Sequence, residues 1–389
     1  MAKLSNLPKV SILTPALNSV RTIEQTIQSV ANQDYTNIEH IVVDGGSTDG
    51  TLDILFRTPQ LLWISEKDDG QSDALNKGYS LANGEILGWL NADDTYTPGA
   101  VSSAVNYLRD HRSTEMVYSN CNHIDEHGRL LFHQKAAPFE LAHQLIDFQI
   151  PQPTVFFRRE MIQQVGKFDT HLHYVMDWAW FMRLGARYPI AYVDETWANF
   201  RVWNETKTSQ HPEKFWQEIL SFFDEFFQDP ALPQQAYAVK DQAYARANWA
   251  LGCITYSQLI RKGVDTGEKG SLLKALHTYP LWKQDHQFAI AQIVHWAVSQ
   301  LESDQFEKYL SQILDEISMI HPGVRSYKRK LLGHIYASSY FTLTRRTSPS
   351  MQGSKSSADL MLKAIQYNPA WLFNRGIQSG LIKLLGRKS

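Results

Sequence analysis

The chain lacks most of the features that mark secreted or membrane-spanning proteins. Its 389 residues include only two cysteines, Cys121 and Cys253, which are far apart and match no metal-binding spacing. So few cysteines argue against a disulfide framework and favour a reducing compartment. No apolar run approaches the ~20 residues that a membrane-spanning helix needs. The opening residues, MAKLSNLPKV, lead directly into a predicted strand, so we expect no signal peptide and a cytoplasmic location.

The chain also lacks a strong charge bias and the common phosphate-binding motifs. The 38 Lys and Arg residues nearly balance the 40 Asp and Glu residues, so no basic field favours nucleic acid as a partner. Neither GxGxxG nor GxxxxGK[ST] is present. The composition, with 43% hydrophobic and 20% charged residues, is that of a folded protein long enough for two or three domains.

The first hundred residues alternate between short apolar runs and stretches with helical periodicity. This rhythm predicts an α/β fold, in which a parallel sheet is connected by crossover helices. The predicted strands cover residues 9–13, 39–43, 61–65 and 85–90. Ser19 is a candidate cap for the first helix, and the second is expected from Thr51 to Phe56.

Polar turns follow three of these strands, at Thr14–Asn18, Asp44–Gly46 and Asn91–Asp94. In an open parallel sheet the carboxyl ends of the strands form the ligand crevice, so Asp44, Asp73 and Asp93 can converge there. Two adjacent carboxylates at the end of a buried strand are costly unless a cation joins them, and a divalent metal bound to phosphates is the usual partner. The alternative is a solvated, Asp-rich turn that caps the next helix.

The pattern changes after Met116. Two strands, 116–125 and 129–133, are predicted to form a hairpin, followed by a strand at 154–158 and a helix at 171–184. That helix carries Asp177 among aromatic residues. Such an acid is either paired structurally or held as a catalytic base, and the residues alone leave both possibilities open.

From Pro212 onward the pattern is helical, which predicts two domains, 1–212 and 213–389, the second all-α. The similar segments 272–280 and 361–369 suggest stacked helical hairpins, although ordinary helical packing explains them equally well. The last segment, 371–389, mixes apolar residues with Arg and Lys and contains no acid. It is typical of a helix on the inner face of an anionic membrane or of a helix docked on the preceding domain.

The segments found so far resemble, in order and spacing, the family 2 glycosyltransferases, which have the GT-A fold. The resemblance covers about residues 9–210 and rests on six stretches: VSILTPALNS (10–19), IVVDGGSTDGT (41–51), SEKDDGQSDALNKG (65–78), GEILGWLNADDTYTPGA (84–100), QPTVFFRREMIQQVGKFDTHLHYVMDWAWFMRL (152–184) and FRVWNETKTS (200–209). It implies an inverting enzyme that uses a nucleotide-diphosphate sugar and a divalent metal, Mn²⁺ or Mg²⁺.

The resemblance also implies roles for individual residues near the donor. The base pocket would be lined by Thr14, Pro15 and Ala16. Asp44 would face the base or ribose, and Asp73 and Lys77 would lie near the nucleotide and diphosphate. Asn91, Ala92 and Asp93 occupy the family's Asp-x-Asp position, with Asp93 as the metal ligand.

The remaining roles concern the sugar and the acceptor. Asp94 would face the donor sugar or the acceptor, and Asp177 would be the catalytic base. The rings of Trp178 and Trp180 suit the C–H faces of sugars, although most aromatic residues of this region are explained at least as well by core packing. Two positions depart from the family: Asn91 replaces the first Asp of the motif, and Trp203 stands where a His is common, with His211 as a substitute.

We therefore expect a UDP-sugar-dependent transferase in bacterial-type surface polysaccharide assembly, acting on a glycan or lipid-linked acceptor. Two alternatives remain. One is a nucleotidyltransferase, disfavoured because no basic, glycine-rich triphosphate loop is present. The other is a catalytically inactive partner that binds sugar nucleotides, which the two departures allow and the intact Asp93 and Asp177 disfavour.

Overall fold

The computed structural model describes residues 7–203 and 210–263, with short helical stretches at 329, 332–333, 335–337 and 362–366. Contacts between Cα atoms divide the chain into two compact units, Met1–Ala243 and Tyr244–Ser389. The predicted repeat at 272–280, most of that at 361–369 and the terminal segment 371–389 lie outside the described residues. None of the helices in the described part combines the length and apolar character that crossing a bilayer requires.

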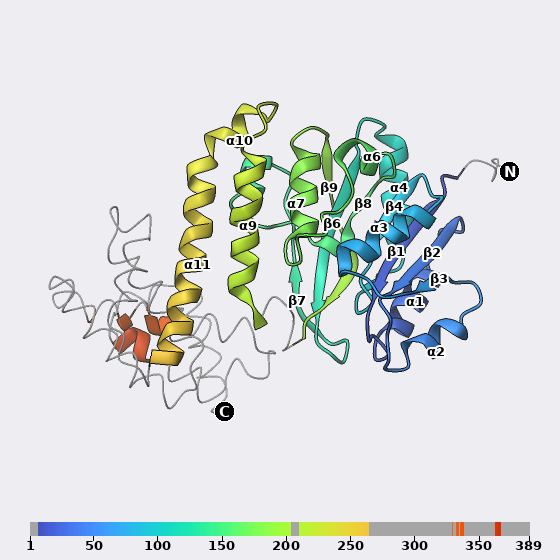
Figure 1. The fold of residues 1–389 in the computed structure, drawn as a ribbon, viewed down its shortest axis with the longest axis horizontal. Helices are drawn as coiled ribbons and strands as arrows, with labels where there is room; N and C mark the ends of the chain where they lie inside the picture. Colours follow the sequence, from blue (N-terminus) through green and yellow to red (C-terminus); the bar gives the residue numbers. More distant parts are fainter. Residues whose placement is uncertain are drawn as a thin grey trace, which may run out of the picture. The chain divides into compact units, whose positions relative to one another are not determined.

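The first unit is built on one nine-stranded sheet with helices on both faces (Figure 1). The strands are β1 (Val10–Ala16), β2 (Ile38–Asp44), β3 (Leu62–Ser65), β4 (Ile86–Trp89), β5 (Thr95–Tyr96), β6 (Met116–Ile124), β7 (Leu130–Gln134), β8 (Phe156–Arg158) and β9 (Ile190–Arg201). The helices are α1 (Ile23–Ala31), α2 (Thr51–Phe56), α3 (Gln71–Leu81), α4 (Ala100–Asp110), α5 (Leu141–Gln144), the 3₁₀ turn η2 (Gln152–Thr154), α6 (Met161–Val165), α7 (Met176–Gly185), α9 (Pro212–Phe226), α10 (Gln234–Ala238) and α11 (Lys240–Gly263).

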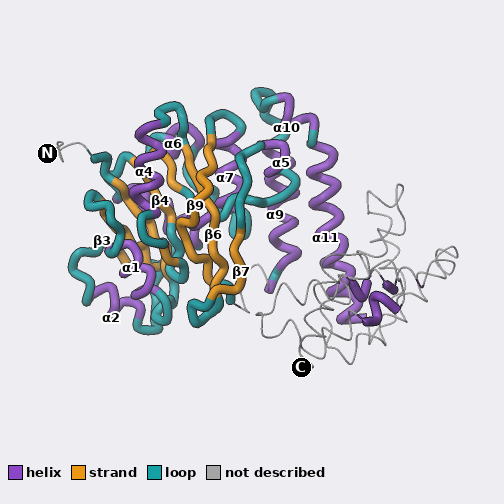
Figure 2. The backbone as a smooth tube through the Cα atoms, turned by 180° about the vertical axis from the view of Figure 1, so that it is seen from behind, coloured by secondary structure: helices purple, strands orange, loops and turns teal. Residues whose placement is uncertain are grey.

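The strand order is β3-β2-β1-β4-β8-β6-β9-β5, and β7 pairs with β6 outside this path. Figure 2 shows strands of this sheet with helices beside them. The strands β1 to β4 are parallel, as predicted, whereas β8 runs antiparallel to β4 and to β6. Because β6 and β9 are parallel to each other, both point in the direction of β4. The carboxyl ends of β1, β2, β4, β6 and β9 therefore lie at one edge of the sheet.

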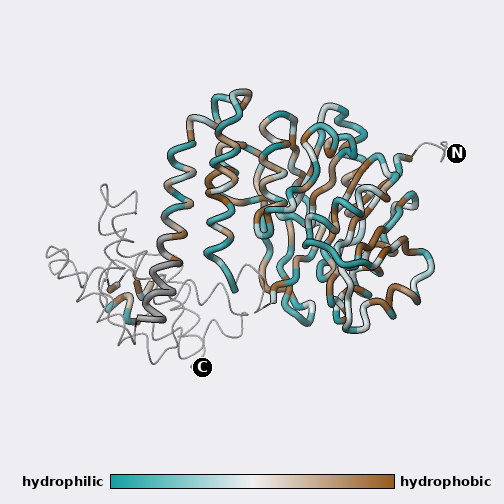
Figure 3. Tube along the Cα trace, viewed as in Figure 1, coloured by the Kyte–Doolittle hydropathy of each residue, from teal (hydrophilic) through white to brown (hydrophobic). Residues whose placement is uncertain are grey.

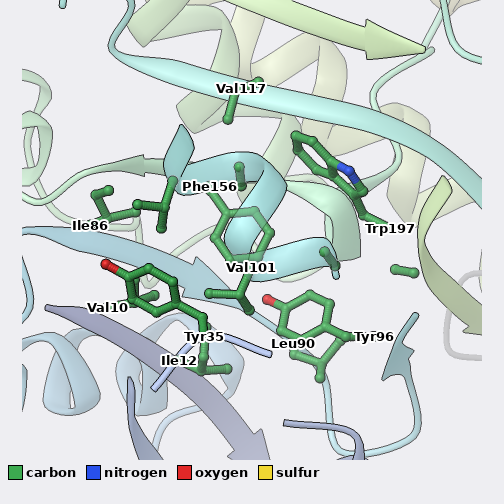
Figure 4. Packing of buried hydrophobic residues seen from close by; sticks show 14 of the residues in the cluster. Val10, Ile12, Tyr35, Ile86, Leu90, Tyr96, Val101, Val117, Phe156 and Trp197 are labelled. Carbon is green, nitrogen blue, oxygen red and sulfur yellow. The ribbon is translucent and has the colours of Figure 1, made fainter. Parts of the chain in front are cut away.

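Because side chains alternate along each strand, the two faces of the sheet pack against different helices. Leu13 and Val43 contact α3, and Phe157 packs on Trp180 of α7. The opposite face carries Ile12 and Phe156, which belong to a core cluster with α1 and α4 (Figure 4). Figure 3 shows hydrophobic segments inside this unit and hydrophilic ones in many of the loops at its margin.

The sequence and the structure differ at several element boundaries. The helix predicted from residue 171 begins only at Met176, and the predicted strand 154–158 begins as the 3₁₀ turn η2. Ser19 was expected to cap the first helix with its side chain, but α1 begins at Ile23 and the hydroxyl of Ser19 donates to the carbonyl of Leu17. The short strand β5 has no alternating pattern and was not expected.

The predicted domain boundary, 212/213, marks the change from mixed to helical structure. The first compact unit nevertheless continues to Ala243, so that α9 and α10 belong to it. Aromatic side chains explain why, since Phe222 and Phe223 of α9 pack edge-on against Trp178 of α7. Burying rings of this size stabilises the contact between α9 and the sheet-bearing unit.

Candidate active site

The loop after β4 is centred on Asn91, whose amide is fully used in hydrogen bonds. Its Oδ1 accepts from Gln71 Nε2 at 2.6 Å and from Trp89 Nε1 at 2.8 Å. Its Nδ2 donates to Gln152 Oε1 at 3.0 Å, and Gln152 in turn donates to the carbonyl of Trp89 at 2.9 Å. Asn91 thus ties β4 to the first residue of α3 and to η2, which brings three distant segments to the same edge.

Asp94 is 1% exposed and serves as an anchor for β9. Its Oδ1 accepts the backbone N–H of Arg201 at 2.8 Å, and Asn91 Nδ2 lies 3.5 Å from its Oδ2. Burial, and then the charge of Asp93, hold the pKa of Asp94 well above its ordinary value. Here the carboxyl group bonds to the protein itself, and its expected contact with the sugar or acceptor stays a prediction.

Arg201, the last residue of β9, binds the loops that follow β4 and β6. Its side chain is buried, and the guanidinium donates to the backbone carbonyls of Asp93, Asp125 and Glu126 at 3.0 to 3.1 Å. A fourth bond, at 2.8 Å, reaches Gln25 Oε1 on α1. A buried guanidinium is stable only with such a set of acceptors, so Arg201 fixes the loop that carries Asp93 relative to β6 and β9.

Asp93, the expected metal ligand, keeps part of its surface exposed beside Trp203. The indole N–H of Trp203 donates to Asp93 Oδ2 at 2.9 Å. The guanidinium of Arg21 stacks 4.8 Å from the centroid of that ring and forms an ion pair with Glu126 at 3.3 Å. Burial raises the pKa of Asp93, because its charge is only partly compensated by these donors.

These residues fit a metal bound through a single carboxylate. No group of three or more His, Cys, Asp or Glu side chains that could hold a metal ion occurs among the described residues. The oxygen of Asn91 already accepts two hydrogen bonds, and Asp94 is buried. Asp93 is therefore the carboxylate that can meet a cation, and a diphosphate would have to supply most of the other oxygen ligands. Nδ1 of His211, the expected substitute for the missing His, lies 3.5 Å from Glu213 Oε1.

The expected base pocket lies at the ends of β1 and β2, where most side chains are buried. Thr14 and Ala16 are 1% and 4% exposed, and Thr14 Oγ1 lies 2.9 Å from Nε2 of His40. Burial lowers the pKa of His40 to about 3, so this imidazole is neutral at pH 7. Pro15 lies between these two residues on β1 and is partly exposed.

Asp44 is fully buried and organises the loop after β2. Its Oδ2 accepts the backbone N–H groups of Gly46 and Ser47 at 3.0 and 2.9 Å and the hydroxyl of Ser65 at 2.7 Å. The hydroxyl of Ser47 donates to Oδ1. Asp44 thus shapes the loop, and its contact with the base or ribose stays a prediction.

Asp73 and Lys77 face each other on α3. Lys77 Nζ lies 3.1 Å from Asp73 Oδ2 and 2.8 Å from Glu66 Oε1. Each of the two residues keeps about a quarter of its side chain exposed, at 26% for Asp73 and 24% for Lys77. They lie one turn apart on a helix that begins beside Asn91, and their expected place near the nucleotide and diphosphate stays a prediction.

Asp177 lies in the first turn of α7, and its side chain is only partly exposed. Its Oδ1 accepts the N–H of Trp178 at 2.7 Å. The hydroxyl of Ser72, in the first turn of α3, contacts Met176 Sδ at 3.0 Å. The amino-terminal turns of α3 and α7 are therefore adjacent, and α3 also carries the Gln71 that binds Asn91. Burial raises the pKa of Asp177 to about 6, the direction that a general base requires.

Trp178 and Trp180 lie in the core. The ring of Trp178 is 6% exposed, packs against Phe148, Phe222 and Phe223, and donates its N–H to the carbonyl of Gln144 at 3.1 Å. Trp180 is 1% exposed and donates to the carbonyl of Gly166 at 2.9 Å. Core packing, the alternative that the sequence left open, therefore accounts for both rings in this structure.

Comparison with known proteins agrees with this arrangement. The family profile described as "Glycosyl transferase family 2" matches residues 11–183. The chain is 30% identical over 182 residues to the PGL/p-HBAD biosynthesis glycosyltransferase of Mycobacterium bovis (strain BCG / Pasteur 1173P2). The matched region covers 45% of this chain and 69% of that protein. The chain belongs to glycosyl transferase family 2. This family 2 glycosyltransferase is also 29% identical over 212 residues to the chondroitin synthase of Escherichia coli, over 54% of its own length and 31% of that protein.

Solved structures confirm the expected GT-A fold. The S. aureus TarS 1–349 structure in complex with UDP-GlcNAc matches with a TM-score of 0.54 at 18% identity, over 82% of this chain and 92% of that one. The mannosyltransferase PcManGT from Pyrobaculum calidifontis, in complex with GDP-Man and Mn²⁺, matches with a TM-score of 0.50 at 18% identity, over 81% and 86%. At this identity both likenesses concern the fold. Family membership sets the nucleotidyltransferase alternative aside.

Three residues of this glycosyltransferase site were not identified from sequence. Gln152 and Arg201 stand inside the stretches 152–184 and 200–209 that resemble the family, but neither has a spacing that distinguishes a buried bridging residue from a surface one. Glu218 lies on α9 outside the matched residues 11–183, and its carboxylate accepts backbone N–H groups just before α7. Because α9 also carries Glu213, Asp224 and Glu225, its sequence does not single out Glu218.

Proposed function

We propose that this glycosyltransferase inverts the anomeric centre of a nucleotide-diphosphate sugar, UDP-linked by expectation, with Asp177 as general base. The proposal rests on the position of Asp177 and on the pKa of its carboxyl group. Its carboxyl lies in the first turn of α7, beside the first turn of α3, and burial raises its pKa to about 6. At neutral pH such a group is ionised yet basic enough to accept a proton.

The reaction needs little more from the protein than this base and an electrostatic partner for the leaving group. The acceptor hydroxyl attacks the anomeric carbon as its proton passes to the Asp177 carboxylate. The bond between that carbon and the β-phosphate oxygen breaks, and the nucleoside diphosphate leaves with the electron pair. Attack from the face opposite the leaving group inverts the centre.

Asp93 is the residue that would hold a divalent metal, Mn²⁺ or Mg²⁺. When bound, the metal would neutralise the charge that develops on the diphosphate. Asp93 is partly exposed and incompletely compensated, and Arg201 holds its loop in place. The Mn²⁺ named with PcManGT supports the use of a metal in this fold.

The named relatives suggest a role in glycan assembly at the cell surface. Chondroitin synthase and the PGL/p-HBAD biosynthesis glycosyltransferase both build glycans, and this supports a glycan or lipid-linked acceptor here. The UDP-GlcNAc bound to TarS supports a UDP-sugar as donor. We propose a cytoplasmic enzyme, in which the basic segment 371–389 makes peripheral contact with the inner face of the membrane.

The proposal is tested by measuring donor binding and donor turnover in the same variants. UDP binding is titrated calorimetrically with and without MnCl₂, and UDP release is followed from a panel of UDP-sugars. Asp177→Asn should bind UDP with the affinity of the wild type. It should form free UDP from a UDP-sugar ~10²–10⁴-fold more slowly, because only proton transfer is removed. Asp93→Ala should fold normally yet lose the metal-dependent part of UDP affinity.

The control variant is Asp169→Asn, which removes a carboxylate from the loop before α7 that has no proposed role in catalysis. Asp169 accepts the N–H of His171 at 2.9 Å and lies 3.7 Å from Arg183. A wild-type rate in Asp177→Asn would refute the general base. Unchanged metal-dependent affinity in Asp93→Ala would refute the metal site.

A further inference from the structure

Glu218 of α9 binds the segment that leads into α7. Its two carboxylate oxygens accept the backbone N–H of His173 at 2.9 and 3.0 Å, and its Oε2 also accepts those of Tyr174 at 2.6 Å and Val175 at 3.2 Å. Three consecutive amides therefore converge on one carboxylate. Figures 1 and 2 both show α9 lying beside α7.

The contact takes the place of a side-chain cap at the start of α7. The N-cap position is Val175, whose side chain has no acceptor for a backbone amide. Glu218 accepts the N–H of Val175 and those of the two residues before it, and its charge is further favoured by the positive end of the helix dipole. Asp177 follows two residues after the cap, so the direction of its side chain depends on how this turn is held.

We infer that Glu218 is a positioning residue for Asp177: by binding the amides of residues 173–175, it fixes the first turn of α7 and keeps the Asp177 carboxylate available to substrate. This inference rests on the proposed role of Asp177 and extends it, because Glu218 lies on a helix beyond the segment matched by the family profile. The helical part of the first unit thereby contributes to catalysis without touching substrate.

The consequence of losing Glu218 follows from what else could satisfy those amides. Asp177 is the carboxylate in the first turn of α7, and its Oδ1 already accepts the N–H of Trp178. With Glu218 gone, Asp177 is the nearest anion along the chain for the same positive helix end. A carboxylate that accepts several N–H groups becomes more acidic, and Asp177 would turn from a base into a structural cap.

Titratable side chains of the described residues also occur near this contact on α9, on the segment before α7 and on α3. Lys214 precedes Glu218 by one turn of α9, and the side chain of His173 lies against Gly70 at the start of α3. Asp73 and Lys77 of α3 are paired with each other. A matched site at the far end of the two helices is Glu225 of α9, which forms an ion pair with Arg183 of α7 at 3.1 Å and is 72% exposed.

The test compares Glu218→Ala, Glu218→Gln and the control Glu225→Gln in the full chain, with Asp177→Asn as reference. For each variant, UDP affinity, kcat and KM for UDP-sugar turnover are measured from pH 4.5 to 8, and folding is checked by thermal unfolding.

Because a displacement of about 1 Å can cost ~10²-fold in rate, kcat of Glu218→Ala should fall by that order while KM and UDP affinity change little. The acidic limb of its pH profile should move to lower pH. Glu218→Gln, which keeps one acceptor oxygen, should be intermediate, and Glu225→Gln should match the wild type.

Wild-type kcat in folded Glu218→Ala would overturn the inference. So would a loss of kcat in which the pH limb stays in place and Glu218→Gln is no better than Glu218→Ala, since that pattern describes general loosening of the fold. If Glu218→Ala does not fold, Glu218→Gln decides by the same two readouts. A wild-type rate in Asp177→Asn would instead refute the proposed base, independently of what the Glu218 variants show.

Discussion

Replacing Asp177 with Asn should stabilise the protein at neutral pH while it removes the proposed catalytic base. Burial raises the pKa of this carboxyl from 3.8 to about 6 in the folded chain. Between these two values the folded state binds more protons than the unfolded state, so the free energy of unfolding decreases as the pH rises. Asn carries no charge and keeps one acceptor oxygen for the N–H of Trp178.

The size of the effect follows from the shift. A change of roughly two pKa units, at 1.36 kcal/mol per unit, corresponds to about 3 kcal/mol at pH 7. This value is an upper bound, because the side chain keeps part of its exposure and water screens the charge. Asp177→Asn should therefore be more stable than the wild type by up to about 3 kcal/mol above pH 6, with no difference below about pH 4.

The assay is unfolding of the full chain in urea at several pH values between 4 and 8. Unfolding of the first unit is followed by its fluorescence. Asp194→Asn serves as a control of opposite sign, since hydrogen bonds from Asn120, Lys135 and Tyr192 lower the pKa of Asp194 to about 2. That substitution should destabilise the protein at neutral pH. In the wild type, kcat/KM should also fall about tenfold for each pH unit below 6, as the base becomes protonated.

Two results would refute this reasoning. Equal stability of Asp177→Asn and wild type at pH 7 and at pH 4 would mean that the carboxyl is solvated in the fold. If Asp177→Asn keeps a measurable rate and its kcat/KM still falls on the acidic side, another group titrates near pH 6.

Three further predictions concern the supports of the site and the terminal segment. Arg201→Met should lower the free energy of unfolding by about 3–5 kcal/mol in urea, because it leaves Asp94 and three loop carbonyls without their buried cation. Gly88→Ala should cost about 1–3 kcal/mol, since an added Cβ would lie 2.8 Å from Ile12 Cδ1, whereas Gly78→Ala, with its nearest contact at 3.4 Å, should be tolerated. Deleting residues 371–389 should abolish cosedimentation with anionic vesicles at low salt and leave UDP binding intact. A full-length protein that never cosediments would favour the docked helix.

Local sequence patterns predicted the elements whose signals are local. The alternation of apolar runs and helical periodicity located β1 to β4 and α2, because each of these strands is a short, mostly apolar run and each turn carries Gly, Asp or Asn. The start of α7 was missed for the opposite reason. Residues 171–175 have helical composition, yet the amides of 173–175 bond to Glu218, more than forty residues later, and no local pattern contains that information.

The same distinction applies to the site. Asp93 and Asp177 could be singled out because a carboxylate at a strand end or among aromatic residues is chemically unusual wherever it occurs. Arg201 and Gln152 could not, since their importance lies in which carbonyls and amides they meet across the sheet. Trp178 shows a limit of sequence reasoning: a ring beside the proposed catalytic base suits a sugar, but the rings of α9 cover it.

The departure at Asn91 follows from these contacts. Its amide donates to Gln152 and accepts from Gln71 and Trp89, a pattern that a carboxylate could meet only in part because it has no N–H to donate. An Asp here would also add a third carboxyl group beside Asp93 and the buried Asp94, whose pKa is already raised by burial and by its neighbour. The chain thus places one partly exposed carboxylate at the proposed metal position and uses the neighbouring amide to hold α3, β4 and η2 together. Asn91→Asp should therefore destabilise the fold in urea at neutral pH, and added Mn²⁺ with UDP should restore part of the loss if the cation offsets the new charge. Stability equal to the wild type without metal would show that Asn91 has no such structural role.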